Sequence, residues 1–363
     1  MKMDKIVCLI LVYVFCVATT HSKQIVSVMS YNAENLFDTT HDIGKKDHTY
    51  LPLSVKRSTP EYLEACRNIR NTYYRHTCLT LDWTESILKQ KIQNLARVIK
   101  ESNNGNSPDI LVLQEIENIN VLRQLRDQGL AKEGYREVIL IEGPDNRGID
   151  VGILSKVPLA EPAKLHLVDL DGKGASATRG ILEATFKVGQ NKITVFGNHW
   201  PSQMNSDYHR VAAAKAMLEA AKNIDNPLVV TGDFNTAPSD DPNAIEDYLL
   251  NPNRDLFFFD GEWEAYGEYR GTHHYRGEWT SLDRIFLLEK TMDSGCRYWW
   301  GDCFTPMWNT FKIVKKDFML KDLTYTDNNG DIVTYEGVPN RFDPKTGEGY
   351  SDHLPVLMKF QFR

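Results

Sequence analysis

Residues 228–235 read Leu-Val-Val-Thr-Gly-Asp-Phe-Asn, a short β-branched run that ends in a polar cluster. The same pattern recurs in segments 25–32, 110–115 and 193–199, which end in Asn32, Glu115 and His199. Apolar runs of this length and composition are typical of buried strands. The sequence therefore predicts four strands, each with polar side chains at its carboxyl end.

Helical patterns lie between some of these strands. Asp82 and Glu85 have the spacing of a capping box, and an apolar face then runs from Leu88 to Ile99, which predicts a helix that opens at Asp82. A second helix is expected near 206–223 and a shorter one near 241–250. Strands and helices that alternate along the whole chain indicate a layered α/β architecture.

Two later strands have their polar residues at the start. Asp283 precedes the apolar run 284–288, and Asp352-His353 precede 354–358. Because the start of one strand meets the end of an antiparallel neighbour, all the polar clusters can lie at one edge of the sheets. A functional site is expected at such an edge.

The composition is that of a folded globular protein. The 363 residues are 42% hydrophobic and 25% charged, which excludes wholesale disorder and a multi-span membrane protein. The net charge of −7 argues against a broad basic surface for long nucleic acid. We see no internal repeat or low-complexity linker, so one domain over 23–363 is expected.

The amino terminus resembles a secretory signal peptide. Lys2 and Lys5 precede an apolar run at 6–18, which is too short to span a bilayer, and small and polar residues follow it up to Ser22. We expect cleavage of residues 1–22 and export to the periplasm or the outside of the cell. Because this removes two positive charges and one negative charge, the net charge changes from −7 to −8. An uncleaved anchor and a lipid anchor at Cys16 are the weaker alternatives.

Four cysteines remain after the predicted cleavage: Cys66, Cys78, Cys296 and Cys303. An even number in an exported chain favours disulfides, and pairing of nearest neighbours is the simplest of three connectivities. A zinc site is less favoured because no C-x-x-C spacing is present. Each pair falls in a stretch that looks inserted, 41–81 or 289–349, and the two stretches are either surface decoration or elements that shape the substrate site.

The converging polar residues are rich in oxygen donors and include two histidines. They are Asn32, Glu115, Asn198, His199, Asp233, Asn235, Asp283, Asp352 and His353. Carboxylate and amide oxygens suit Mg²⁺, with Mn²⁺ or Ca²⁺ as alternatives. A divalent ion, a carboxylate base and imidazolium groups are what phosphoester hydrolysis requires.

Seven motifs occur in an order that resembles the endonuclease/exonuclease/phosphatase superfamily, the DNase I-like fold. They are YNAENLFD (31–38), LQEIEN (113–118), RGIDVGILS (147–155), GNHWPS (197–202), TGDFNTAP (231–238), SLDRIFL (281–287) and SDHLPV (351–356). The wording N-H-W-P-S is most similar to the exported bacterial branch. The resemblance covers about 25–361 and implies a four-layer α/β sandwich, in which helices flank two packed mixed β-sheets.

The resemblance also implies a role for each matching residue. Glu115 matches the principal metal ligand, Asn32 an amide that helps to bind the ion, and Asp352 a further carboxylate near it. Asp233 and Asn235 match the residue that activates water and the amide that holds the phosphate. His199 and His353 match two active-site histidines, and Asp283 matches the aspartate that orients His353. Asn198 and Arg147 are expected to contact the substrate.

Each of these residues also has a structural interpretation. Asp233 with Asn235 fits a turn cap, His199 a satisfied interior histidine, and Asp283 a partner for Arg284. Glu117 and Asn118 look like a helix entrance. Asp150 fits either a rim position or a salt bridge, in which Arg179 is the suggested partner. His273 and His274 are expected at the surface, because the family pattern does not include them.

The sequence therefore predicts a metal-dependent phosphoester hydrolase, with a secreted nuclease or phosphodiesterase as the expected activity. A phosphatase or phospholipase-type hydrolase of sugar- or lipid-phosphate esters remains the alternative, because substrate choice in the superfamily lies in loops. A binding protein without catalysis is disfavoured by the complete histidine and carboxylate set. No stable protein partner is implied, and a monomer is expected.

Overall fold

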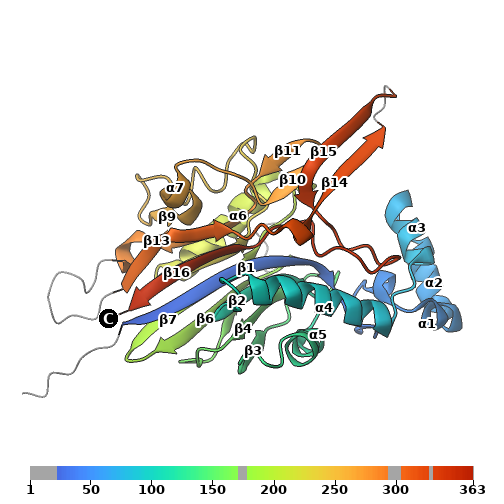
Figure 1. Ribbon diagram of the computed structural model, residues 1–363, viewed down its shortest axis with the longest axis horizontal. Helices are drawn as coiled ribbons and strands as arrows, with labels where there is room; N and C mark the ends of the chain where they lie inside the picture. The colour runs from blue at the N-terminus through green and yellow to red at the C-terminus, as the bar shows by residue number, and fades with distance from the viewer. Residues whose placement is uncertain (1–22, 171–177, 293–303, 327–329, 363) are drawn as a thin grey trace, which may run out of the picture.

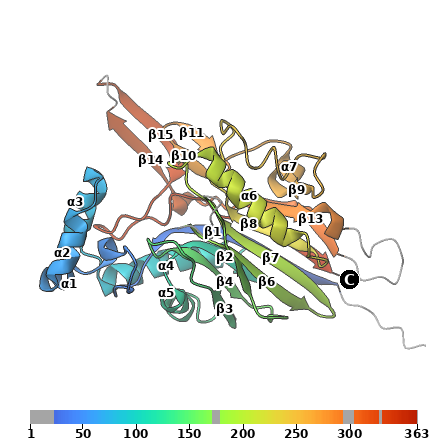
Figure 2. The same ribbon diagram turned by 180° about the vertical axis from the view of Figure 1, so that it is seen from behind.

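Two six-stranded mixed sheets pack face to face in the structure, a computed structural model that describes residues 23–170, 178–292, 304–326 and 330–362 (Figure 1). Strands of the first sheet follow the order β13-β16-β1-β2-β4-β3, and those of the second follow β5-β6-β7-β8-β12-β9. Helices cover the outer faces, so the predicted four-layer α/β sandwich is confirmed (Figure 2).

The first sheet is antiparallel except between β1 and β2, which run parallel. Its strands are β1 (Gln24–Leu36), β2 (Ile110–Ile116), β3 (Glu137–Leu140), β4 (Asp150–Ser155), β13 (Phe304–Ile313) and β16 (Val356–Phe362). In the second sheet only β7 and β8 run parallel. Its strands are β5 (Lys164–His166), β6 (Ile181–Val188), β7 (Asn191–His199), β8 (Leu228–Asp233), β9 (Phe258–Asp260) and β12 (Asp283–Leu288).

The apolar core has three layers because both faces of the central strands are covered. Val26 and Val28 of β1 lie between the sheets, whereas Met29 and Tyr31 pack in the outer cluster beneath α4 (Glu85–Glu101). A third cluster lies between the second sheet and α6 (Asp207–Ala221). Strands covered on both faces read as continuous apolar runs, which is the pattern seen in the sequence.

The remaining helices and hairpins are short. They are α1 (Leu53–Ser58), α2 (Pro60–Arg67), α3 (Thr72–Thr80), α5 (Ile119–Gln124), α7 (Gly261–Tyr266), the single turns η1 (His48–Tyr50), η2 (Leu125–Gly129), η3 (Glu289–Thr291) and η4 (Asp317–Met319), and the hairpins β10 (His273–Tyr275) with β11 (Glu278–Thr280) and β14 (Leu320–Thr326) with β15 (Ile332–Pro339). Helices α1–α3 and the hairpin β14–β15 extend from the end of the molecule that lies away from the C-terminus (Figures 1 and 2).

Two predicted helix features are wrong. Thr84, not Asp82, caps α4, since its side chain accepts from Ile87 N at 3.4 Å, while Asp82 accepts from Leu53 N at 2.6 Å and so is attached to α1. Residues 241–250 form turns rather than a helix, because the bonds Asp247 N to Asn243 O and Leu249 N to Ile245 O stay isolated. The helix expected near 206–223 is α6, which Ser206 caps.

The first inserted stretch contains η1 and α1–α3, and a disulfide joins Cys66 to Cys78 there, as nearest-neighbour pairing predicts. Beside it, the buried ammonium of Lys56 donates to the carbonyls of Cys78 at 2.8 Å and Leu81 at 2.6 Å. Cys296, Cys303 and the predicted signal segment lie outside the described residues. No helix of the described part combines the length and apolar character needed to cross a membrane.

Gly232 allows β7 and β8 to approach closely next to the polar edge. Its φ is +149°, and a Cβ atom there would lie 2.0 Å from the carbonyl oxygen of Asn198. Any larger residue would therefore push apart the two strands that end in His199 and Asp233.

Candidate active site

Strand pairing places three of the predicted site residues in one row. His199 at the end of β7 pairs with Asp233 at the end of β8, and Asp233 pairs in turn with Asp283 at the start of β12. The start of an antiparallel strand thus lies beside the ends of two parallel ones. We refer to this edge and the loops around it as the rim, which also holds Glu115 and His353.

Asp233 accepts hydrogen bonds through both carboxylate oxygens. Oδ1 accepts from Asn235 N at 2.9 Å, and Oδ2 accepts from Asn235 Nδ2 at 3.0 Å and from Asn32 Nδ2 at 3.1 Å. Burial raises the pKa of Asp233 to about 7, with Asp283 and Glu115 adding to the effect while His353 opposes it. A carboxyl with this pKa can take up a proton near neutral pH, as a general base must.

Asp283 orients His353 through a hydrogen bond to its Nδ1 atom. Its Oδ2 lies 2.7 Å from His353 Nδ1 and accepts at 2.7 Å from the hydroxyl of Thr272. Asp283 is fully buried, and it does not pair with Arg284, whose guanidinium instead bonds to Asp260. A charged acceptor at Nδ1 fixes the ring and leaves Nε2 as the atom that faces the rim.

The surroundings of His353 favour its protonated, positively charged form. Burial works against the charge, but the carboxylates of Asp283 and Asp233 outweigh it and hold the pKa of His353 well above its ordinary value. Its Nε2 lies 4.0 Å from Asp233 Oδ2 and 4.0 Å from Asp352 Oδ1. An imidazolium N–H at this position can donate to a phosphate oxygen.

His199 differs from His353 in charge. Burial, followed by repulsion from Arg179 and Arg147, lowers the pKa of His199 well below its ordinary value. Its Nε2 lies 3.6 Å from Asp233 Oδ2 and 3.8 Å from Glu115 Oε1, and its buried Nδ1 has no hydrogen-bond partner among the described residues. The unpartnered nitrogen does not fit the interpretation of His199 as a satisfied interior histidine.

Glu115 lies in a strained turn at the end of β2. Its φ is +61°, and Asn35, at +60°, donates its backbone N–H to Glu115 Oε2 at 2.8 Å. Left-handed backbone at a non-glycine residue costs free energy and occurs often at functional sites. Glu115 Oε1 makes no hydrogen bond within the described part, so it is available as a ligand atom.

Asp352 lies on the His353 side of the rim. Its Oδ2 forms an ion pair with Arg341 Nη2 at 3.3 Å, and Arg341 Nε also donates to Glu34 Oε1 at 2.6 Å. Burial works against ionisation, yet His353 and Arg341 lower the pKa of Asp352. Burial and the charge of Asp352 raise the pKa of Glu34 to about 7. The sequence does not predict the pairing of Glu34 with Arg341, because they are 307 residues apart and only the folded sheets bring them together.

Arg147 and Arg179 converge on Asp145 at the edge of the site. Both guanidinium groups approach Asp145 Oδ2, at 3.3 Å for Arg147 and 3.2 Å for Arg179. The Arg147 side chain is 53% exposed and can reach an anion, whereas Arg179 is 6% exposed. The suggested pairing of Arg179 with Asp150 is wrong, since Asp150 accepts from Gly143 N at 2.9 Å instead.

Asn198 lies beneath the site rather than in it. The residue is fully buried, its Oδ1 accepts from Trp200 Nε1 at 3.0 Å, and its Nδ2 donates to Phe196 O at 3.2 Å. These bonds give Asn198 a structural role in place of the expected substrate contact. Asn118 caps α5 and Glu117 accepts from Asp38 N at 2.6 Å, in line with a helix entrance.

His273 is half-buried and lies at the rim, where no role was expected for it. A backbone bridge joins His273 to His353, and their ring centroids are 4.8 Å apart. Burial, followed by the charge of His353, lowers the pKa of His273 to about 4. His274 points the other way, onto the rings of Trp279 and Tyr335. Only the long-range bridge brings His273 to the rim, so no local signal reveals it.

The residues at the rim fit a divalent cation. Among the described residues, Glu115 offers an oxygen without a hydrogen bond, and Asn32 offers an amide oxygen that accepts only from Glu34 N at 2.9 Å. Asp233 adds a carboxylate that accepts from the side-chain amides of Asn32 and Asn235. This hard oxygen set suits Mg²⁺ or Mn²⁺. His273, Asp352 and His353 form a second group of potential ligand atoms within 4.8 Å of one another.

Comparison with known proteins places the chain in a family. Residues 68–361 match the Endonuclease/Exonuclease/phosphatase family, whereas no curated protein sequence matches. An endonuclease/exonuclease/phosphatase from Bacteroides vulgatus has a similar structure (14% identity, 94% of this chain and 100% of that chain, TM-score 0.51).

Humanized TDP2 from D. rerio is also similar (13% identity, 93% and 98% of the two chains, TM-score 0.49), as is a mannosyl-6-phosphatase from Bacteroides thetaiotaomicron (14%, 92% and 99%, TM-score 0.48). At these identities the likeness concerns the fold, and the sequence match over most of the chain concerns the family. The chain belongs to the endonuclease/exonuclease/phosphatase family of phosphoester hydrolases.

Proposed function

We propose that the protein is a divalent-metal-dependent phosphodiesterase, with nucleic acid fragments as its substrate class. The observation that carries the chemistry is the unit of Asp283, His353 and Asp233, which combines an oriented imidazolium with a carboxyl of pKa about 7. One group takes a proton from water while the other supports the charge that develops on the phosphate.

In this mechanism Asp233 accepts the proton of the attacking water, and the amides of Asn32 and Asn235 hold its carboxylate in place. The water oxygen bonds to phosphorus while the P–O bond to the leaving alcohol breaks, and the leaving oxygen takes a proton from solvent. His353 donates from Nε2 to a phosphate oxygen while Asp283 keeps its ring oriented. Arg147 supplies a further positive charge at the exposed edge. Glu115 and Asn32 would hold a divalent ion, which would neutralise charge on the phosphate.

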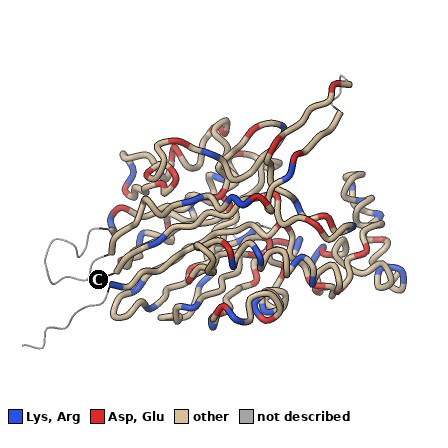
Figure 3. The backbone as a smooth tube through the Cα atoms, viewed as in Figure 1, with Lys and Arg blue, Asp and Glu red and all other residues tan. Residues whose placement is uncertain are grey.

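Preference for an oligonucleotide over a small ester rests on the two inserted stretches. The hairpin β14–β15 carries Tyr325, which is 39% exposed, and α3 carries Tyr73, which is 71% exposed. Both elements extend from the same end of the molecule (Figures 1 and 2). Exposed aromatic rings can stack on successive bases without a broad basic surface. This suits a chain of net charge −7, in which basic residues are interspersed with acidic ones (Figure 3).

Hydrolysis should be compared under one Mg²⁺ concentration for four substrates: a single-stranded oligonucleotide, a plasmid, a hexose 6-phosphate and sphingomyelin. Of the four substrates, the oligonucleotide should have the highest kcat/KM. A hexose phosphate that is cleaved faster would establish the phosphatase alternative, and faster cleavage of sphingomyelin would establish a phospholipase-type activity. A loss of about 10²-fold or more in His353→Ala, purified in parallel, excludes a contaminating hydrolase.

Export is part of the same proposal and rests on the apolar run at 6–18. Mass spectrometry of the protein from its host should show a chain that starts near residue 23, with a second disulfide between Cys296 and Cys303. An intact amino terminus in that material would contradict cleavage, and free thiols at Cys296 and Cys303 would contradict the second disulfide.

A further inference from the structure

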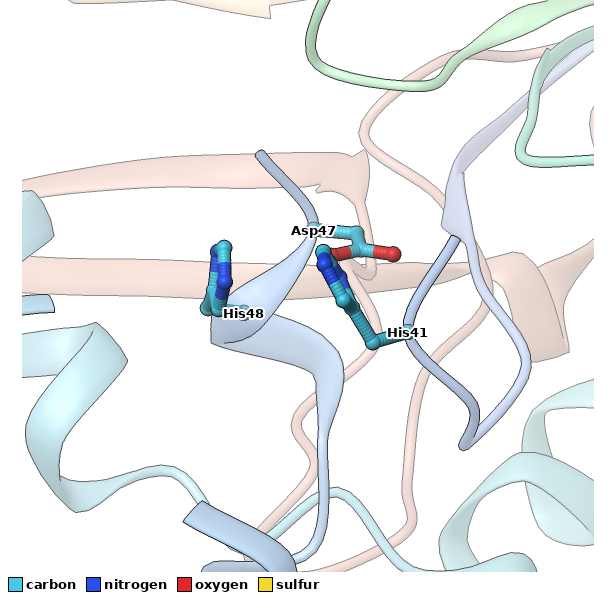
Figure 4. A group of neighbouring side chains, drawn as sticks. All are labelled: His41, Asp47 and His48. Carbon is cyan, nitrogen blue, oxygen red and sulfur yellow. The ribbon is translucent and has the colours of Figure 1, made fainter. Parts of the chain in front are cut away.

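Two imidazoles and a buried carboxylate meet in the first inserted stretch, outside the active site. The potential ligand atoms of His41, Asp47 and His48 all lie within 4.8 Å of one another (Figure 4). His41 Nδ1 bonds to Asp47 Oδ1, and the ring centroids of His41 and His48 are 4.5 Å apart. We propose that these three side chains bind a zinc ion.

The carboxylate is fixed before any metal arrives. Asp47 is 1% exposed, and its Oδ2 accepts from Asp42 N at 2.7 Å, which leaves Oδ1 directed at His41 (Figure 4). An imidazole bonded to a carboxylate in this way can exchange its shared proton for a metal ion. Ligand atoms on a tetrahedral zinc lie about 3.3 Å apart, since each is about 2.0 Å from the ion, so the hydrogen-bonded pair must move apart to take up the ion.

His48 supplies the third donor and has no competing role. Neither ring nitrogen of His48 makes a hydrogen bond within the described residues, although the side chain is half-buried. The edge of Tyr62 packs against both imidazoles, with centroids 5.0 Å from His41 and 5.1 Å from His48, and so keeps the rings together.

The backbone that carries the ligands is held by neighbouring segments. Lys46 N donates to Asn146 O at 2.7 Å, and Lys45 Nζ donates to Gly143 O at 3.2 Å and to Asp145 O at 3.1 Å. Because the ligand segment is already anchored, binding of the ion does not have to order a free loop. The same contacts join it to Asp145, the residue on which Arg147 and Arg179 converge.

The ligand types select zinc over the ions expected at the rim. Two imidazoles and one carboxylate form a borderline donor set that suits Zn²⁺, whereas Mg²⁺ and Ca²⁺ prefer oxygen alone. Three protein ligands leave a fourth position for water. A cavity of about 450 Å³, lined in part by His48, Asn68 and Arg70, gives solvent access to this place.

The test is zinc binding by the chelator-treated full chain, measured by calorimetry and by elemental analysis after dialysis, with Co²⁺ absorption as a spectroscopic probe of the ligands. His48→Gln is the main variant because it breaks no hydrogen bond. His41→Gln provides a second ligand deletion. His76→Gln, an exposed histidine on α3, is the matched control. His273→Gln/His353→Gln removes both histidines of the second group of potential ligands, which also contains Asp352, and is called the rim variant.

We expect His48→Gln and His41→Gln each to bind one zinc fewer per chain than the wild type, whereas His76→Gln and the rim variant retain this zinc. Zinc should raise the thermal midpoint of the wild type and of the rim variant but not that of His48→Gln. Equal zinc content in His48→Gln and wild type would overturn the proposal. Loss of the ion in the rim variant alone would also overturn it, since the zinc would then belong to the active site.

Discussion

The Nδ1 atom of His353 lies 2.7 Å from Oδ2 of Asp283, although 70 residues separate the two in the sequence. The same oxygen accepts from Thr272, and the backbone N–H of Asp283 donates to the Thr272 hydroxyl at 3.0 Å. Thr272 thus holds Asp283 at its carboxylate and at its backbone N–H, and the imidazole that Asp283 orients directs Nε2 towards Asp233.

Replacement of either member of this pair should remove most of the activity. His353→Ala and Asp283→Ala are each expected to lower kcat by about 10²–10⁴-fold, because one loses the charge at the phosphate and the other loses its orientation. The double variant should be little worse than the single ones, since the two act as a unit. Losses that multiply in the double variant would show that Asp283 and His353 act independently.

Asp233→Asn should be severe while the fold stays intact. The asparagine keeps the shape and part of the hydrogen bonding but cannot accept a proton, so a loss of about 10²-fold or more is expected. In the wild type kcat/KM should fall as the pH drops below about 7, because protonation of Asp233 removes the base. A wild-type profile that is flat from pH 5 to 8 would contradict this role.

Glu117→Gln should stabilise the protein at neutral and alkaline pH. Burial, followed by the charge of Asp38, raises the pKa of Glu117 from 4.5 to about 9. Because the pKa is higher in the folded state than in the unfolded state, protonated Glu117 contributes to the free energy of unfolding. This contribution is present in full below pH 4.5 and is lost as the pH rises towards 9.

The free energy of unfolding that Glu117 loses has an upper limit of about 1.4 kcal/mol per pH unit. Glutamine does not titrate, so it removes this pH dependence while it keeps an acceptor for Asp38 N. Urea unfolding at pH 6, 7 and 8 should therefore show a smaller pH slope for the variant. Glu278→Gln, at an exposed position of β11, should keep the wild-type slope. Identical slopes for Glu117→Gln and wild type would show that Glu117 is not protonated in the folded protein.

Gly232→Ala should destabilise the sheet next to the rim by about 2–4 kcal/mol, since its Cβ would meet the Asn198 carbonyl at 2.0 Å. Gly44→Ala is a matched control, because it also has positive φ, +85°, but no atom within 4 Å of the added Cβ. If thermal melts show equal losses of stability in Gly232→Ala and Gly44→Ala, the backbone strain of a positive φ, and not separation of the strands, explains the need for glycine at 232.

Much of the architecture could be predicted from strand composition and from which end of each strand is polar. The apolar runs within 25–32, 110–115, 193–199 and 228–235 form strands because both faces of the sheets are covered. Polar residues at the start of one strand and at the end of another predict that these strand ends meet, as Asp283 and Asp233 do. Local patterns were less reliable at element ends. Thr84 outcompetes Asp82 as the cap because the Asp82 carboxylate bonds to Leu53 N.

The contacts that sequence reasoning missed are all long-range. His273 reaches the rim through its bridge to His353, and Glu34 meets Arg341 only after 306 intervening residues have folded. Arg179 pairs with Asp145, whereas Asp150 accepts from Gly143 N. Spacing along the chain carries no information about such pairs, since the sheets and hairpins that create them must form first.

Metal-dependent hydrolysis by the rim residues is the central claim, and the rate of cleavage of a model phosphodiester as a function of Mg²⁺ concentration tests it most directly. EDTA should abolish the activity, and Mg²⁺ should restore it. Glu115→Gln should need a higher Mg²⁺ concentration and remain at least about 10²-fold slower at saturation, because it loses a charged ligand. Full activity in EDTA, or a Glu115→Gln curve that coincides with the wild type, would contradict it.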